Sequence, residues 1–117
     1  MFLTLNHQKL DLYVISIELV SECYKLTRSM PVEEKFGMIS QIRRASLSVH
    51  LNISEGSSRH SQVERRRFFE IARGSLIEID AALDVANMLG YLVNVQIDKL
   101  GGLIIQSFKI LTALMKK

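Results

Sequence analysis

The chain of 117 residues has little of what builds sheets, long loops or cross-linked folds. It contains one proline, one cysteine and no tryptophan, and only 7% of its residues are aromatic. A lone Cys23 cannot form a disulfide within the chain, which is typical of proteins in a reducing cytosol. Turn-forming residues are scarce and 48% of the chain is apolar, a balance that favours helices over strands.

Targeting and membrane segments are also missing from the sequence. The opening stretch MFLTLNHQK lacks the basic flank and apolar run of a signal peptide, and no apolar segment approaches the roughly 18 residues of a membrane span. We therefore expect a soluble, cytoplasmic protein without membrane contact. The length suits one domain with a real core, so residues 1–117 are predicted to form a single domain.

Motifs for catalysis and metal binding are absent as well. The three histidines are not spaced as zinc ligands, and no pattern joins a nucleophile to a histidine and an acid. Glu78, Asp80 and Asp84 form an acidic row, but they lack the Glu-x-x-His partners of a di-metal bundle site. A solvated face explains this row more simply. We predict no catalytic residue, no metal, no cofactor and no enzymatic activity.

Four segments show apolar residues at helical spacing. The pattern predicts helices from about residue 9 to 28, from 33 to 57, from 61 to 90, and from 94 onward. Proline at position 31 separates the first two, and Gly56 ends the second. Ser61 and Glu64 form a capping box at the start of the third. Because the connections are short, successive helices run antiparallel, and the sequence predicts an all-α, up-down four-helix bundle.

The first and last predicted helices carry more apolar surface than one packed face requires. The first has two adjacent stripes. The last has a predicted core stripe of Ile97, Leu100, Ile104, Phe108, Leu111 and Met115, and beyond it Leu103, Ile105, Ile110 and Leu114. Soluble monomers rarely expose such a surplus, so we predict a homo-oligomer. Gly101 and Gly102 in this helix indicate either close approach of another backbone or a local kink.

The second predicted helix bears a row of polar side chains beside its apolar face, which we call the polar ladder. At roughly 100° per residue, the row comprises Gln41, Arg44, Ser48, Asn52 and Glu55, and Arg59 continues it. A buried charge needs a partner, so an internal ladder has to be a paired network that fixes the second helix to the third. An exposed ladder is instead a surface for a ligand or a nucleic acid. The sequence leaves both interpretations open.

The positive charge of the chain is confined to one window. Residues 59–73 hold five arginines and two glutamates, an excess equal to the net charge of +3 of the whole chain. We call these arginines the basic pole: Arg59, Arg65, Arg66, Arg67 and Arg73. Cations are disfavoured at the positive end of a helix dipole. Glu70, four residues after Arg66, offsets part of this cost, and nothing else nearby in the sequence offsets the rest. Arginine binds phosphate in a bidentate manner, which indicates nucleic acid, while a neighbouring subunit or an acidic protein are the alternatives.

Several separated motifs carry a family resemblance. They are Leu10–Tyr13, Gln41–Ala45, Asn52–Gly56, Arg59, Ala72–Glu78 and Leu89–Tyr91. In this order they resemble the four-helix bundle family of 23S rRNA intervening-sequence proteins, and the resemblance covers nearly the whole chain. Two features depart from that pattern. His50 and Leu51 stand where proline is usual, which predicts a milder kink, and Arg65–Arg67 is more basic than expected.

The resemblance implies a ring-like homopentamer without catalytic activity. It also implies a possible nucleic-acid or reverse-transcriptase partner, because the related accessory variability determinant of diversity-generating retroelements binds both through a basic surface. We expect a non-enzymatic accessory protein that binds RNA or DNA backbone through the basic pole, joined by Arg43, which lies off the polar ladder and is expected to be exposed. The alternative is a scaffolding homo-oligomer that binds a protein and no nucleic acid.

Overall fold

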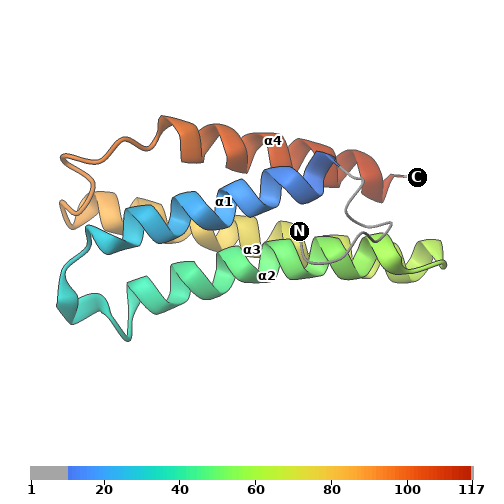
Figure 1. Ribbon diagram of the computed structural model, residues 1–117, viewed down its shortest axis with the longest axis horizontal. Coiled ribbons are helices and arrows are strands. Elements are labelled where there is room, and N and C mark those ends of the chain that lie inside the picture. Colours follow the sequence, from blue (N-terminus) through green and yellow to red (C-terminus); the bar gives the residue numbers. More distant parts are fainter. Residues whose placement is uncertain (1–10, 117) are drawn as a thin grey trace.

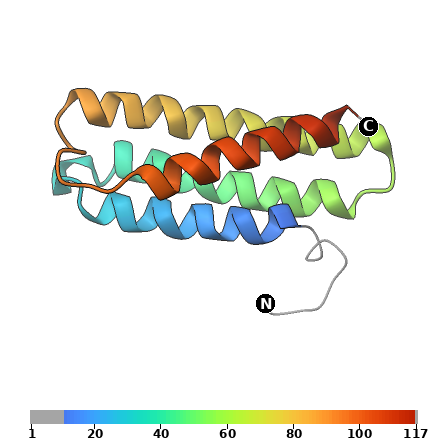
Figure 2. The same ribbon diagram turned by 90° about the horizontal axis from the view of Figure 1, so that it is seen from above.

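The computed structural model describes residues 11–116. They form the elements α1 (Asp11–Arg28), the short 3-10 helix η2 (Val32–Glu34), α2 (Met38–Ser58), α3 (Gln62–Met88) and α4 (Asp98–Met115). Each α-helix runs antiparallel to the one before it, and α1 also packs against α4 (Figures 1 and 2). Consequently α2 lies diagonally across the bundle from α4. The predicted all-α, up-down four-helix bundle is confirmed.

The helix α2 begins later than predicted. Residues Val32–Glu34 form a separate 3-10 turn after Pro31, and α2 starts at Met38. The side chain of Glu34 still serves the start of α2, because its Oε1 accepts a hydrogen bond of 3.2 Å from the amide of Met38. The acidic residue thus caps the helix from outside it, where an exposed amide and the positive dipole end favour a carboxylate.

The connection between α3 and α4 is also longer than predicted, since α4 starts at Asp98 rather than near residue 94. Gly90 follows α3 with φ of 81°, a left-handed conformation that glycine adopts without strain. Tyr91 then donates a hydrogen bond of 2.9 Å from its hydroxyl to Glu34. This bond joins the α3–α4 connection to η2 and raises the pKa of Tyr91.

The capping box predicted at the start of α3 forms in part. The amide of Glu64 donates to Ser61 Oγ over 3.4 Å, so one half of the predicted capping box forms at the start of α3. The helix α2 continues without interruption through His50. The ring of His50 lies 4.6 Å from the ring of Tyr13 in α1, which packs the two helices together.

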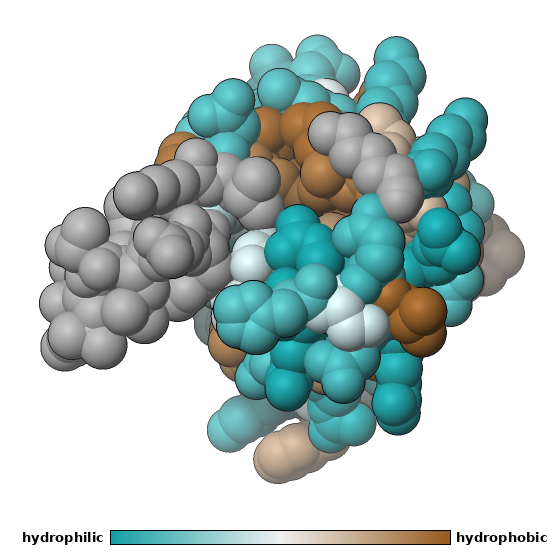
Figure 3. All heavy atoms as spheres, turned by 90° about the vertical axis from the view of Figure 1, so that its right-hand side faces the viewer, coloured by the Kyte–Doolittle hydropathy of each residue, from teal (hydrophilic) through white to brown (hydrophobic). Residues whose placement is uncertain are grey.

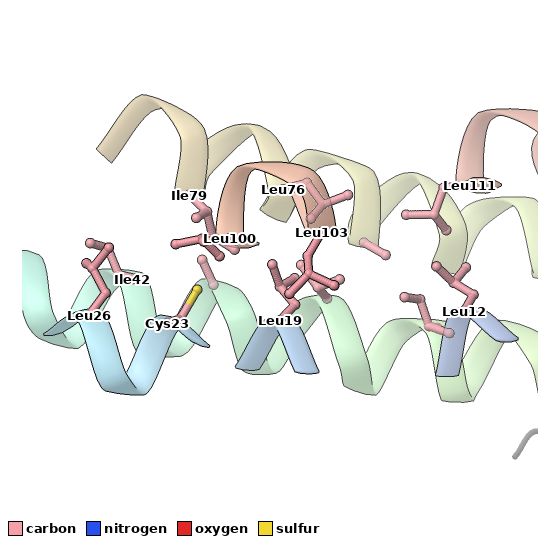
Figure 4. Close-up of a cluster of buried hydrophobic side chains, with 14 of the residues drawn as sticks. Leu12, Leu19, Cys23, Leu26, Ile42, Leu76, Ile79, Leu100, Leu103 and Leu111 are labelled. Carbon is pink, nitrogen blue, oxygen red and sulfur yellow. The ribbon is translucent and has the colours of Figure 1, made fainter. Parts of the chain in front are cut away.

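The core is a single apolar cluster to which all four α-helices contribute (Figure 4). Its fully buried side chains include Leu12, Leu19, Ile42, Leu76, Ile79 and Leu111. The predicted stripe of α4 was partly wrong. Leu103, assigned to the surplus, is buried, whereas Ile97 and Phe108, assigned to the core, are exposed. The helix is rotated relative to the prediction because its continuous apolar sequence permits more than one packing face.

Cys23 lies within this cluster and is fully buried (Figure 4). Burial raises its pKa to about 12, and a hydrogen bond to Ser46 only partly opposes this effect. The thiol is therefore a packed core group, as its apolar neighbours in the sequence indicated. No helix within residues 11–116 combines the length and the apolar character needed to cross a bilayer.

Gly56 lies where α2 packs tightly against α3. A Cβ atom there would lie 2.7 Å from Cε1 of Phe69, a buried ring, and 3.2 Å from the carbonyl oxygen of Arg65. By contrast, a Cβ atom at Gly74 in α3 would meet no atom within 4 Å among the described residues. Two glycines in neighbouring helices thus have opposite structural roles.

We expect Gly56→Ala to lower the free energy of unfolding by about 1–3 kcal/mol, because the added methyl group overpacks the seam between the helices. Gly74→Ala is the matched control and should raise it by about 0.5–1 kcal/mol through lower backbone entropy of the unfolded chain. Urea denaturation followed by circular dichroism measures both. Equal effects of the two substitutions would show that Gly56 does not set the approach of the helices.

The burial of Cys23 predicts protection and a defined pH dependence. Iodoacetamide at pH 8 should label the native protein far more slowly than the protein unfolded in concentrated urea. Because folding raises the pKa of Cys23, the buried neutral thiol makes a contribution to the free energy of unfolding that is complete below pH 9. This contribution declines as the pH rises toward 12. Cys23→Ser, which removes the label site, controls for other reactions. Labelling of native protein at the denatured rate would contradict the assignment.

Candidate nucleic-acid interface

The basic pole lies at one end of the bundle, where α2 passes into α3 and where α4 ends (Figure 1). Antiparallel packing brings together here the starts of α1 and α3 and the C-terminal ends of α2 and α4. Those C-terminal ends carry unpaired carbonyl groups and partial negative charge. Hydrophilic residues cover most of the described surface in the view onto this end of the bundle (Figure 3). The end is therefore polar, with helix dipoles of both signs.

Two arginines of the basic pole satisfy those helix ends. Arg65 donates from Nη1 to the carbonyl oxygens of Ser57 at 3.1 Å and Arg59 at 3.3 Å, at the end of α2. Arg66 donates from Nε to the carbonyl oxygen of Met115 at 2.9 Å, at the end of α4. Charges that the sequence leaves largely without a local partner thus find partners in the fold. The compensating groups are the C-terminal carbonyls of two other helices, which α3 meets only in the folded bundle.

Arg59 and Arg73 are also held by contacts within the chain. Arg59 forms an ion pair of 2.9 Å with Glu55 and lies 5.1 Å from the centre of the Phe68 ring. Arg73 is two turns farther along α3 than the rest of the pole. It donates to Thr112 Oγ1 at 3.3 Å and lies 5.6 Å from the ring of Phe108, so it ties α3 to α4. Its guanidinium is half-buried in that seam.

Arg67 differs from the other members of the basic pole. Its side chain is exposed, and within residues 11–116 it has no hydrogen-bond or ion-pair partner. Exposed His60 and Lys116 belong to the same end of the bundle. Arg67 is thus the arginine whose full charge is available to a partner, with Arg59 and Arg66 exposed beside it.

Arg43 does not belong to this end. It is half-buried between α1 and α2, where Nε donates to Thr27 Oγ1 at 2.8 Å and the guanidinium lies 4.6 Å from the ring of Tyr24. Along α2, it is separated from Arg59 by about 24 Å of helix. The expectation that Arg43 is exposed was wrong, because Thr27 and Tyr24 of α1 supply a polar and an aromatic partner that the α2 sequence does not reveal.

The polar ladder follows the seam between α2 and α3. In its centre, half-buried Ser48 accepts a hydrogen bond of 3.0 Å from Ser75 of α3, and Asn52 donates to Ser48. At one end, exposed Gln41 donates to Glu78 of α3 over 3.2 Å. The ladder therefore bonds α2 to α3, but it is not the fully paired network that an internal ladder requires.

Arg44 is the ladder member with a free charge. It is exposed, and the described part of the chain offers it neither a hydrogen bond nor an ion pair. Glu55 pairs with Arg59 and is likewise exposed. The charged members of the ladder, Arg44 and Glu55, therefore face solvent, whereas the neutral Gln41 and Ser48 bond to α3.

No three His, Cys, Asp or Glu side chains gather in residues 11–116 where they are placed to hold a metal ion. The acidic row of Glu78, Asp80 and Asp84 is exposed along α3. The chemistry that this surface offers is thus hydrogen bonding and charge from guanidinium groups, directed outward at one end of the bundle.

We expect Arg66→Ala to lower the free energy of unfolding by about 1 kcal/mol, because the last carbonyl of α4 loses a charged donor. Arg67→Ala, one residue away and without a partner among the described residues, should change it by less than about 0.5 kcal/mol. Urea denaturation of both variants distinguishes a helix-capping arginine from a free one. Identical stabilities would contradict the capping role.

Residues 8–113 match the family described as 23S rRNA-intervening sequence protein. Among curated proteins, no relative matched. The family match covers α1 to α3, α4 up to residue 113, the polar ladder and every arginine of the basic pole. By this match over most of its length, the chain belongs to the 23S rRNA-intervening sequence protein family.

Proposed function

We propose that this protein is a non-enzymatic accessory protein of the cytoplasm that assembles into a homo-oligomer, a pentamer, and binds RNA or DNA backbone. The contact surface is the end of the bundle that carries the basic pole. One observation supports this proposal above the others: the window with the entire charge excess of the chain includes Arg67, which is exposed and has no partner among residues 11–116.

The contacts within the chain divide the basic pole by role. Arg67 is the principal phosphate contact. Arg59, which pairs with Glu55, and Arg66, which donates to the end of α4, add the exposed parts of their guanidinium groups. Arg65 and Arg73 are half-buried and support the structure of this end. Arginine suits this role because its charge does not titrate and its planar group donates paired hydrogen bonds to phosphate.

The surface recognises backbone rather than bases. Phe69 is buried and Phe68 is half-buried under Arg59, so neither presents an open face for base stacking. Contacts to phosphate carry no sequence information by themselves. One such end offers few contacts, and a homo-oligomer multiplies them, so that binding strengthens with assembly and weakens steeply with salt.

A second candidate function is a scaffold that binds a protein, such as a reverse transcriptase, and no nucleic acid. It is favoured by the number of arginines that already have partners in the chain, since Arg59, Arg65, Arg66 and Arg73 all form internal contacts. In this case the arginines serve folding, and Arg67 pairs with an acidic partner. The two functions differ in whether purified protein binds nucleic acid directly.

We expect Arg67→Ser to weaken binding of a fluorescein-labelled 30-mer RNA or DNA several-fold and to reduce the dependence of affinity on salt, because one phosphate contact per subunit is lost. Fluorescence anisotropy at low and moderate salt measures both quantities. The matched control is Arg28→Ser, which lies where α1 ends, at the other end of the bundle from the basic pole. This variant should bind as the parent does. Absence of binding by the parent protein, or equal loss in both variants, would favour the scaffold.

A further inference from the structure

An open apolar groove runs between α3 and α4. Toward the basic pole it has a cavity of about 300 Å³ lined by Ile77, Asp80, Ile105, Phe108 and Lys109. Toward the other end it continues as a cavity of about 270 Å³, which shares Asp80 and Ile105 and adds Asp84 and Gly101. Ile105 is 58% exposed and Phe108 is 37% exposed. The helices α3 and α4 thus leave part of their facing apolar surface uncovered.

The groove carries carboxylates at its middle and toward the end away from the basic pole, because Asp80 lines both cavities and Asp84 only the second. Asp80 and Asp84 are exposed on α3, and neither has a hydrogen-bond or ion-pair partner in residues 11–116. Toward the basic pole, the apolar lining continues beyond Asp80 and Ile105 with Phe108. A molecule that fits the groove therefore needs a cation followed by apolar side chains in this direction.

The outer ridge of α2 has that order. Arg44 is followed at helical spacing by Leu47, 42% exposed, and by Leu51, 52% exposed. Successive members lie about 4.5 Å and 6 Å farther along the helix. Arg44 is the ladder residue without a partner in the described chain, and the ridge runs from Arg44 toward the basic pole (Figure 1). Ridge and groove are thus complementary in charge and in apolar character.

The direction of the match determines how two copies are oriented. Both α2 and α4 run antiparallel to α3. In both the ridge and the groove, the order from charged to apolar side chains therefore points toward the basic pole. Two copies with parallel axes place Arg44 beside Asp80, and Leu47 and Leu51 against Ile105 and Phe108. Copies with opposed axes place Arg44 against Phe108 and Lys109 instead. Charge complementarity therefore selects the parallel arrangement.

Glycine at position 101 is consistent with a second molecule binding in the groove. A Cβ atom at this position would meet no atom within 4 Å among the described residues, so no neighbouring helix of the same chain requires glycine there. Glycine in the middle of a helix is unfavourable relative to alanine. An approaching side chain from a second molecule gives it a role, because Gly101 lines the groove itself.

We infer that the α3–α4 groove binds the α2 ridge of a second copy of this chain, with Arg44 paired to Asp80 and Asp84. Because α2 lies diagonally across from α4, the two surfaces are distinct, and the contact is head-to-tail. Such a contact closes into a ring or continues as a filament. Parallel axes put every basic pole on one side of the assembly. The inference rests on the proposed homo-oligomer and names the surfaces that build it.

Charge reversal tests the contact. Arg44→Glu and Asp80→Lys should each shift the full-length protein toward the 13.3 kDa single chain and weaken self-association at least tenfold, measured by light scattering over a concentration series. The double variant, with both reversals in one chain, should recover assembly, because every contact then contains a reversed pair. Arg67→Glu, an exposed arginine outside ridge and groove, is the matched control and should keep the parent mass.

The outcomes separate this inference from the proposed function. A parent protein that assembles, with variants that keep its mass, overturns the ridge-and-groove contact and leaves oligomeric nucleic-acid binding intact. A parent protein that stays at 13.3 kDa throughout the series overturns both the homo-oligomer and its contact. Assembly of the parent, loss in both single variants and recovery in the double variant, without nucleic-acid binding, supports the contact and leaves the scaffold as the function.

Discussion

The meeting of oppositely directed helix ends at one tip of the bundle is the constraint on which the charged surface depends. The carbonyls that close α2 and α4 lie beside the first turns of α3, and Arg65 and Arg66 donate hydrogen bonds to them. Cations that are unfavourable at the start of their own helix are thus favourable at the ends of two others. These hydrogen bonds join the helix ends and leave guanidinium groups at the surface.

This arrangement links stability and proposed function through the same residues. Arg59 and Arg66 hold contacts within the chain, yet both remain exposed, while Arg67 has no internal contact among the described residues. Phosphate is an acceptor, as carbonyl and carboxylate oxygens are, so exposed donors can serve both. Fixed guanidinium groups also lose less conformational freedom when a ligand arrives, which favours binding by a pre-formed surface.

The long sides of the bundle have a different character from the tip. Leu47 and Leu51 on one side, and Ile105 and Phe108 on another, are apolar side chains that the four-helix core does not cover. Each set adjoins a charge without a partner in residues 11–116, Arg44 beside the first and Asp80 beside the second, and these two charges are opposite in sign. Apolar area combined with opposite charge is what a specific contact between copies requires, because burial supplies affinity and charge fixes orientation.

Apolar periodicity, the break at Pro31 and the cap at Ser61 determined four helices, and short connections determined their antiparallel order, because these signals are local along the chain. The sequence alone also located the charge at residues 59–73. Only the tertiary structure decided that Arg43 packs on Thr27 and Tyr24 and that Arg66 reaches Met115. It also decided that α4 buries Leu103 rather than Phe108. The partners of these arginines lie on other helices, so the spacing within one helix does not reveal them. The rotation of α4 depends on how several apolar faces fit together, and the spacing within α4 does not determine it either.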